Sequence, residues 1–249
     1  MAHSLPHAES IYREFHFMIH SRTAVIIPAL NEEQSIAHVV QAIPRVVVQE
    51  IIVVDNGSSD RTAEVAHTAG ATVLSESRKG YGYACLTGID HALKSEPDVI
   101  AFVDGDLSDY PEQLPEILRP ITEDGCDLVI GSRIIGEREN GAMLPQALFG
   151  NWLACCLIRL LWGYRFTDLG PFRAIRVEAL QRMNMTDPTF GWTVEMQIKA
   201  AKLKLRCTEV PVRYRKRMGN SKVTGTLAGT IKASIKILYT ILKYLVVKV

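Results

Sequence analysis

Two aspartates separated by one residue carry the clearest chemical signal in this chain of 249 residues. Asp104 and Asp106 follow the apolar run 99–103, and Gly105 between them lets a ligand approach the backbone closely. Paired carboxylates of this kind hold hard divalent cations such as Mg²⁺ or Mn²⁺. A cation held there would bridge to a diphosphate and neutralise its charge as it leaves. The pair predicts metal-assisted phosphate chemistry, although a solvated acidic turn has the same sequence.

Polar loops follow three other apolar runs. Residues 28–32 (PALNE) follow the run 23–27, residues 55–60 (DNGSSD) end the run 50–54, and residues 78–82 (RKGYG) follow the run 71–74. Carboxylates and glycines in such loops suit a nucleotide, because carboxylates accept hydrogen bonds from a base or a ribose. Each loop taken alone is also compatible with an ordinary helix-capping turn. Their shared position after a strand favours one common site.

The elements that would position these loops alternate along the first half of the chain. Short β-branched runs predict strands at 23–28, 50–55, 71–74, 98–104 and 128–131. Helices are expected between them at 31–43, 61–69 and 81–93. This alternation predicts a mostly parallel, doubly wound α/β sheet with helices on both faces. Ligands bind beyond the carboxyl ends of such strands, where the polar loops lie.

The second half is organised differently. Helices are expected at 144–162, 177–183 and 194–203, a strand at 207–214 and a final helix at 225–249. That last helix is amphipathic, since three lysines (232, 236 and 243) share one face and Ile and Leu side chains lie opposite. We therefore expect an N-terminal extension at 1–22, one domain at 23–224 and a C-terminal amphipathic helix at 225–249.

Composition and charge narrow the function further. The chain is 47% hydrophobic and 22% charged, which excludes collagen-like and wholly disordered proteins. Residues 1–125 carry a net charge of −11 and residues 126–249 one of +12. The basic half predicts an anionic partner, and its many Ile, Leu and Val residues favour a membrane surface over nucleic acid. Neither a signal peptide nor an uncharged apolar span is visible, so we expect a cytoplasmic protein at the inner face of the membrane.

Seven segments in series resemble known enzymes. Residues 25–33 (VIIPALNEE), 53–62 (VVDNGSSDRT), 104–106 (DGD) and 131–133 (GSR) are similar to glycosyltransferase family 2. Residues 168–173 (DLGPFR), 190–195 (FGWTVE) and 219–222 (GNSK) are most similar to its polyprenyl-phosphate branch, which includes dolichyl-phosphate mannose synthase. The resemblance covers about residues 23–222.

The resemblance implies a GT-A-type nucleotide-sugar-binding fold and inverting transfer of a hexose from a UDP- or GDP-linked donor. It implies that Asp104 and Asp106 hold Mg²⁺ or Mn²⁺, and that Ser108 stands where the mannose synthase pattern has an amide ligand. The implied donor-binding residues are Pro28, Ala29, Asn31, Glu32, Asp55, Gly57, Lys79, Gly80, Asp104, Gly105 and Asp106. The implied catalytic residues are Asp104, Asp106, Arg133, Asp168 and Glu195. The residues expected to bind an acceptor phosphate are Arg133, Arg138, Arg173, Arg215, Ser221 and Lys222.

The chemistry of the acceptor leaves two readings open. A polyprenyl phosphate is already anionic near neutral pH and needs only cations to hold it, and arginine forks suit that task. An alcohol acceptor on a glycan or glycolipid needs a base, for which Asp168 or Glu195 would serve. Both have structural alternatives: Asp168 as the partner of Arg133 or Arg173, and Glu195 as the partner of Lys199.

Two further classes remain as alternatives. A nucleotidyltransferase would be expected to carry a glycine-rich basic loop after its first strand, where this chain has PALNEE. A non-catalytic nucleotide-sugar-binding subunit is less expected, because Asp104 and Asp106 are both present. The sequence leaves self-association into a homo-oligomer open.

Overall fold

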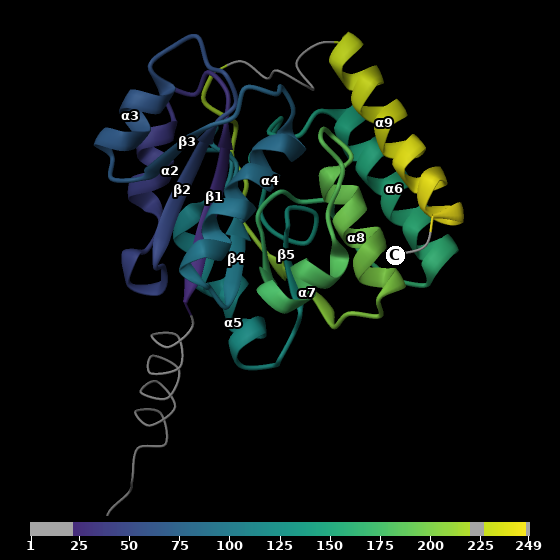
Figure 1. The fold of residues 1–249 in the computed structure, drawn as a ribbon. Helices are drawn as coiled ribbons and strands as arrows, with labels where there is room; N and C mark the ends of the chain where they lie inside the picture. The colour runs from purple at the N-terminus through teal and green to yellow at the C-terminus, as the bar shows by residue number, and fades with distance from the viewer. Residues whose placement is uncertain (1–21, 220–226, 248–249) are drawn as a thin grey trace, which may run out of the picture.

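A computed structural model describes residues 22–219 and 227–247. Within these residues one seven-stranded sheet has the order β3-β2-β1-β4-β6-β5-β7 (Figure 1). The strands are β1 (Thr23–Ala29), β2 (Glu50–Asp55), β3 (Thr72–Ser75), β4 (Val99–Phe102), β5 (Leu128–Ser132), β6 (Arg173–Arg176) and β7 (Cys207–Pro211). All pairings are parallel except those of β6, which runs antiparallel to β4 and β5. The prediction of a mostly parallel sheet is confirmed.

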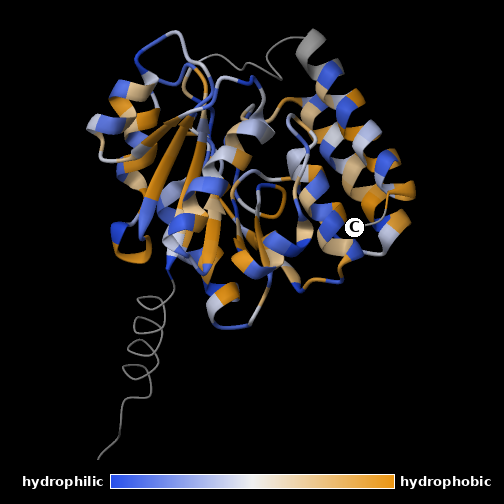
Figure 2. Ribbon diagram, in the orientation of Figure 1, coloured by the Kyte–Doolittle hydropathy of each residue, from blue (hydrophilic) through white to orange (hydrophobic). Residues whose placement is uncertain are grey.

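Helices cover both faces of the sheet, because successive side chains of a strand point to opposite sides. In β1, Val25 and Ile27 pack with one group of helices, whereas Ala24 and Ile26 pack with the other. The first group is α2 (Ile36–Ala42), α3 (Thr62–Thr68) and α5 (Leu114–Thr122). The second is α4 (Tyr81–Ala92), α6 (Pro145–Trp162), α7 (Val177–Met183) and α8 (Trp192–Lys202). Strands β1, β2 and β4 are largely hydrophobic (Figure 2), which is typical of a sheet buried on both faces.

Two elements were not expected, and one begins late. Helix α5 contains Pro115 near its start and Pro120 in its interior, and prolines in a pattern normally argue against a helix. Strand β6 has only four residues and two arginines, so its sequence carries almost no apolar signal. Helix α2 begins at Ile36 rather than residue 31, since Asn31 adopts a left-handed backbone with φ of 52°.

Helix α9 (Leu227–Val246) lies against α6 and α8. Ile241 and Tyr244 of this helix are buried in the core, whereas Ile235, Leu238 and Leu242 are exposed. The C-terminal helix is thus integrated into the fold through one of its faces. No helix in the described part of the chain is both long and apolar enough to cross a membrane. The predicted N-terminal extension, apart from Arg22, lies outside the described residues.

Candidate active site

A cavity of about 390 Å³ opens at the carboxyl edge of the sheet, among the loops that follow β1, β2, β3 and β4. Eight of the predicted donor-binding residues line it: Pro28, Ala29, Glu32, Lys79, Gly80, Asp104, Gly105 and Asp106. Leu30, Asn56, Tyr81, Ala84, Thr189, Phe190 and Arg217 complete the wall. The topology therefore brings the polar loops together at one edge, as the strand–loop pattern predicts.

The two aspartates are oriented by different neighbours. Asp104 Oδ1 accepts a hydrogen bond from the Tyr81 hydroxyl at 3.1 Å. Asp106 Oδ1 accepts from the backbone N–H and the hydroxyl of Ser108, at 2.9 and 2.5 Å. Ser108 thus orients one carboxylate oxygen of Asp106 and leaves Oδ2 directed elsewhere. Asp109 nearby is buried, and neither of its carboxylate oxygens has a hydrogen-bond partner among the described residues.

The donor set fits a hard divalent cation that shares a phosphate ligand. The described residues contain no cluster of three or more His, Cys, Asp or Glu side chains able to hold a metal, so the protein offers the Asp104–Asp106 pair. Mg²⁺ is commonly held by one or two carboxylates together with substrate phosphates and water. Burial and the Asp106 carboxylate raise the pKa of Asp104 to about 7, and a bound cation would relieve that strain between like charges.

This raised pKa predicts a pH-dependent affinity for Mn²⁺. Protonated Asp104 cannot bind a cation, so affinity is expected to fall roughly tenfold per pH unit below about pH 7 and to level off above it. In the absence of metal, the pH dependence of stability has the opposite sign. The folded chain holds a proton on Asp104 that the unfolded chain releases, so the contribution of Asp104 to the free energy of unfolding falls as pH rises towards 7. Calorimetric Mn²⁺ titrations between pH 5.5 and 8.5 test this, and an affinity independent of pH would contradict it.

The loops after β1 and β2 brace each other beside the cavity. The Asn31 backbone N–H donates to the Ser58 hydroxyl at 2.8 Å, and Asn31 Oδ1 accepts from the Ser59 backbone N–H at 2.7 Å. Asp55 accepts from the Ser58 backbone, and Gly57 has a positive φ of 81°. Asn31, Asp55 and Gly57, predicted to bind the donor, thus lie in the loops that frame the cavity and do not line it.

Asn56, which the sequence analysis did not select, fixes the third loop. Its side-chain amide donates to the carbonyls of Glu76 and Arg78, and its Oδ1 accepts from the Gly80 backbone at 2.7 Å. These three contacts hold Lys79 and Gly80 at the cavity wall. The only sequence signal was its position beside Asp55, at the end of a strand.

A loop from the second half of the chain packs onto this wall. Pro188 accepts a hydrogen bond from the Tyr83 backbone at 3.1 Å. A Cβ at Gly80 would lie 2.2 Å from the Pro188 carbonyl oxygen, and one at Gly82 would lie 1.9 Å from that of Asp187. The two glycines are required by this close approach of two backbones. It brings Thr189 and Phe190 to the cavity.

Glu195 holds the loop that carries Pro188 in place. It is fully buried, and its carboxylate accepts from the backbone of Thr186 and Asp187, from Lys199 and from the Tyr244 hydroxyl of α9. Although burial opposes ionisation, the Lys199 and Tyr244 hydrogen bonds hold the pKa of Glu195 below its ordinary value. Asp187 in turn pairs with Lys236 of α9 at 2.7 Å. The structure therefore places Glu195 in a supporting network outside the cavity lining.

Arg133 and Asp168 form a buried pair at the end of β5. Asp168 Oδ2 accepts from the backbone N–H and Nε of Arg133, both at 2.8 Å, and Oδ1 accepts from Nη2 at 2.7 Å. Both carboxylate oxygens are thereby committed to one guanidinium. The Arg133 guanidinium also lies 5.0 Å from the centre of the Tyr214 ring. Arg138 donates to the Arg133 carbonyl at 2.6 Å.

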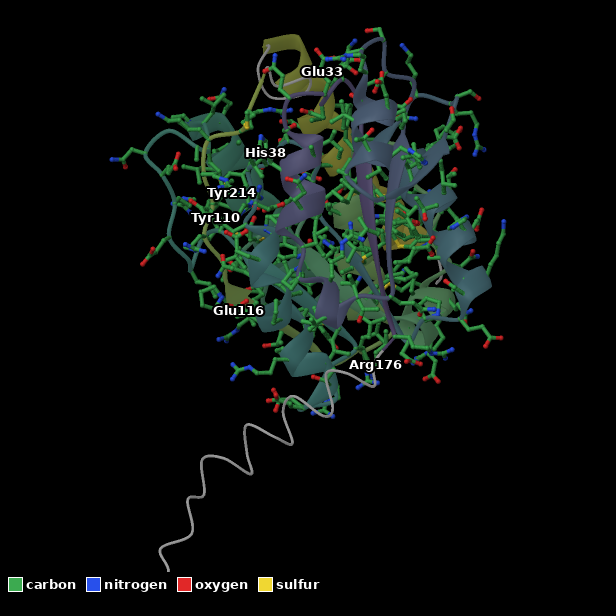
Figure 3. All side chains as sticks on the ribbon, turned by 90° about the vertical axis from the view of Figure 1, so that its left-hand side faces the viewer. Glu33, His38, Tyr110, Glu116, Arg176 and Tyr214 are labelled. Atoms are coloured by element: carbon green, nitrogen blue, oxygen red, sulfur yellow. The ribbon has the colours of Figure 1, made fainter. Side chains whose placement is uncertain are left out.

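The remaining predicted phosphate ligands are dispersed. Arg173 is fully buried and donates to the carbonyls of Leu169, Gly170 and Thr193, so it does not reach the site. Arg215 donates to the Leu107 carbonyl at 2.6 Å and lies over the Tyr110 ring. Figure 3 labels Tyr110 on the same side of the molecule as Tyr214. Ser221 and Lys222 lie outside the described residues.

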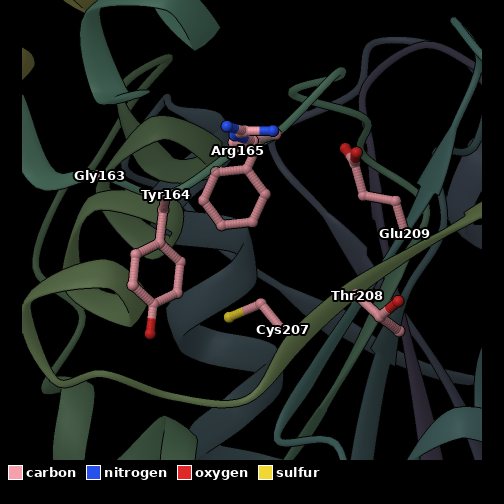
Figure 4. Close-up of a pocket in the computed structure, with 7 residues that line it drawn as sticks. Gly163, Tyr164, Arg165, Cys207, Thr208 and Glu209 are labelled. Atoms are coloured by element: carbon pink, nitrogen blue, oxygen red, sulfur yellow. The ribbon is translucent and has the colours of Figure 1, made fainter. Parts of the chain in front are cut away.

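A second cavity of about 400 Å³ lies beside β7 (Figure 4). Its lining residues are Gly163, Tyr164, Arg165, Phe166, Cys207, Thr208 and Glu209, none of which was predicted to bind the donor or the acceptor. Glu209 accepts from the backbone of Thr167 and Asp168 at 2.9 and 3.1 Å, so it supports the loop that carries Asp168. One residue of this cavity wall therefore also holds the backbone beside Asp168 in place.

Comparisons with known proteins agree with this geometry. Residues 24–183 match the profile described as glycosyl transferase family 2. An uncharacterized glycosyltransferase of Mycobacterium tuberculosis is 36% identical over 211 residues, covering 84% of this chain and 93% of that protein. The undecaprenyl-phosphate mannosyltransferase of Micrococcus luteus is 31% identical over 225 residues, covering 84% and 90%. The dolichyl-phosphate hexose transferase of Haloferax volcanii is 35% identical over 203 residues, covering 80% and 86%.

A solved structure supports the same fold. Glucosyl-3-phosphoglycerate synthase from Mycobacterium tuberculosis, crystallised with Mn²⁺, uridine diphosphate and phosphoglyceric acid, superposes with a TM-score of 0.76 at 23% identity. The match covers 96% of this chain and 84% of that one. The predicted GT-A-type fold is confirmed. The family match and the relatives above show that this chain is a glycosyltransferase and belongs to glycosyltransferase family 2.

Proposed function

We propose that this enzyme transfers a hexose, with inversion, from a nucleoside-diphosphate sugar to a polyprenyl phosphate. The observation that carries the proposal is the Asp104–Asp106 pair, which lines one cavity together with Lys79, Gly80 and Arg217. That arrangement suits a diphosphate. The diphosphate would contact the carboxylates through a shared cation and would contact the cationic side chains directly. The names of the Micrococcus and Haloferax relatives support a lipid phosphate as the acceptor.

Different residues of the chain would bind the donor diphosphate and the metal. Lys79 and the N-terminus of α4 face the cavity, where the positive end of the helix dipole favours an anion. Mg²⁺ or Mn²⁺ held by Asp104 and Asp106 would neutralise charge on the departing diphosphate. An acceptor phosphate oxygen attacks the anomeric carbon as its bond to the diphosphate oxygen breaks. The phosphate arrives as an anion, so this displacement needs no proton acceptor.

The environment of the two candidate bases favours the phosphate acceptor over an alcohol. Asp168 gives both oxygens to Arg133, and Glu195 is enclosed by Thr186, Asp187, Lys199 and Tyr244. A general base must reach the proton that it removes. Neither carboxylate lines the cavity.

The direct test compares matched acceptors. UDP- and GDP-hexoses are first screened with Mn²⁺ for an increase in the unfolding temperature, because a bound ligand stabilises the folded state. The stabilising donor is then supplied with a polyprenyl phosphate, with the corresponding polyprenol, or with 3-phosphoglycerate. Transfer to the polyprenyl phosphate and not to the polyprenol is expected. Equal transfer to the polyprenol, or transfer to phosphoglycerate alone, would contradict the proposal.

The exposed apolar side chains of α6 and α9 support docking at a membrane surface. These helices lie side by side (Figure 1), and on them Phe149, Trp152, Leu160, Leu238 and Leu242 are all exposed. On α9, Lys236 turns inward to pair with Asp187, whereas Leu238 and Leu242 face solvent. Adjacent helices with exposed aromatic and aliphatic side chains are suited to the boundary between head groups and acyl chains.

Replacing both Leu238 and Leu242 with Asn is expected to reduce binding to phosphatidylglycerol-containing vesicles by about tenfold or more, since each buried leucine contributes roughly 1.5–3 kcal/mol. Vesicle flotation measures this effect. These side chains are exposed, so the fold should be retained, whereas removal of α9 would expose the core around Ile241 and Tyr244. Val46, which is 74% exposed on the other side of the sheet, provides the control Val46→Asn. Unchanged flotation of the double variant would remove the docking proposal.

A further inference from the structure

Arg217 lies across the acidic wall of the donor cavity. Its Nη2 donates to Glu32 Oε1 at 2.8 Å, and its Nη1 lies 3.2 Å from Asp106 Oδ2. One guanidinium therefore pairs with two carboxylates that come from the loops after β1 and β4. The Arg217 side chain is 27% exposed, and both carboxylates are more deeply buried.

The backbone fixes this position. The Arg215 N–H donates to the Ser108 carbonyl and the Met218 N–H to the Asp106 carbonyl, both at 2.9 Å. Arg215 Nε also donates to the Leu107 carbonyl at 2.6 Å. The segment that carries Arg217 is thus bound along the loop that carries the aspartates. Arg217 reaches the pair because its own backbone is held against them.

Arg217 retains a donor that nothing in the described structure uses. Its Nε is buried and has no hydrogen-bond partner, although the side chain lines the donor cavity. A buried donor on a charged group is unfavourable unless an acceptor is supplied. The planar guanidinium presents its N–H groups in a fork that matches phosphate oxygens. The diphosphate of a donor in this cavity would supply the missing acceptor.

Arg217 and a bound cation would compete for the same oxygen, Asp106 Oδ2. Because Oδ1 accepts from Ser108, Oδ2 is the oxygen available to a cation, and it is also the one beside Arg217 Nη1. A guanidinium and a divalent cation at the same oxygen repel each other strongly in a buried site. Arg217 therefore opposes a cation that arrives alone.

We propose that Arg217 exchanges partners during donor binding. In the free enzyme it neutralises Asp106 and Glu32; when a divalent cation binds Asp106, Arg217 keeps Glu32 as its pivot and turns Nη1 and Nε to the donor diphosphate. The inference rests on the proposed metal-dependent use of a nucleoside-diphosphate sugar. It makes Arg217 a donor-binding residue that couples two ligands: the cation alone binds weakly, and the cation with a diphosphate binds well. Such a coupling must be reciprocal.

The test is a binding cycle that needs no turnover. Free Mn²⁺ is measured by electron paramagnetic resonance in titrations of the full-length protein, with and without UDP or GDP. Arg217→Gln is expected to bind Mn²⁺ alone about five- to tenfold more tightly than the parent, since the competing charge is gone. The same variant is expected to lose most of the increase in Mn²⁺ affinity that the nucleotide produces in the parent. An Mn²⁺ affinity that is unchanged or weaker without nucleotide, or an unchanged coupling, would overturn the inference.

Two further variants sharpen the result. Arg217→Lys keeps the positive charge but lacks the planar fork and the Nε donor, so the nucleotide coupling is expected to fall at least threefold. Full coupling in this variant would also overturn the proposal, even if Arg217→Gln does not fold. Arg213→Gln is the matched control, because the Arg213 guanidinium pairs with Glu112 and lies over Tyr110, and neither residue lines the cavity. The Mn²⁺ affinities of Arg213→Gln, with and without nucleotide, should match those of the parent. If the parent binds no Mn²⁺ even with UDP or GDP present, or if Asp106→Asn does not weaken that binding, the proposed function fails together with the inference. If only the Arg217 variants behave like the parent, the inference alone fails.

Discussion

Replacing Asp106 with Asn is expected to lower sugar transfer by about 10³-fold, the scale observed when a preorganised electrostatic group is lost from an active site. The asparagine Oδ1 can still accept from the backbone and hydroxyl of Ser108, so the turn that follows β4 should persist. The negative charge beside Arg217 disappears, and with it the second carboxylate of the pair. Catalysis is therefore expected to be lost while the fold is retained.

Initial rates with saturating donor measure the loss of transfer, and nucleotide binding with Mn²⁺ or with a chelator measures the loss of metal dependence. The unfolding temperature of Asp106→Asn should lie close to that of the parent. Glu33→Gln serves as a control acid at the same edge of the sheet: Glu33 accepts from the Arg61 backbone and does not line the cavity. Full activity of Asp106→Asn would end the assignment of the metal site.

Replacing Asp168 with Asn is expected to have the largest effect on stability. Asp168 is fully buried, and three N–H groups of Arg133 donate to its two oxygens. An asparagine turns an N–H₂ group towards one of these donors and leaves a buried guanidinium without a counter-charge. Breaking a buried ion pair on one side costs about 3–5 kcal/mol. Urea unfolding at pH 7 measures the change in the free energy of unfolding.

The matched control is Asp98→Asn, because Asp98 pairs with Arg22 at 3.4 Å where both side chains are about half exposed. Exposed pairs contribute about 0–1 kcal/mol, so this variant should be nearly as stable as the parent. Burial opposes ionisation of Asp168, yet the Arg133 charge and hydrogen bonds hold its pKa below the ordinary value. A depressed carboxyl pKa adds stability above the ordinary pKa range, and that stability is lost as pH falls through the native value. The difference between Asp168→Asn and the parent should therefore shrink in acid.

The pH dependence of transfer in Asp168→Asn separates the two acceptor chemistries. With a phosphate acceptor, the residual activity should fall at all pH values while the shape of the profile stays the same. If Asp168 were the base for an alcohol acceptor, the limb of the profile that reports its ionisation would disappear. That outcome would favour transfer to a glycan or glycolipid.

The sequence alone predicted most of the strands of the sheet, the edge that carries the candidate site, and the aspartate pair that we propose as the metal ligands. Strand β1, all seven residues of which are buried, is a continuous apolar run, and such a run is readable without knowing its neighbours. Asp104 and Asp106 directly follow such a run, so the polarity of a parallel sheet places them at the edge where ligands bind. The predicted amphipathic C-terminal helix was likewise visible from periodicity along α9.

Tertiary structure decided which charged residues meet. Nothing in the local sequence distinguishes Arg217, which reaches Glu32 and Asp106, from Arg173, which is buried against three carbonyls. Thr189 reaches the cavity because Gly80 and Gly82 let a backbone far along the chain approach α4. Periodicity reports which face of an element is buried, because that depends on residues a few positions apart. The partner of a buried charge depends on how distant elements pack, and only the folded chain contains that information.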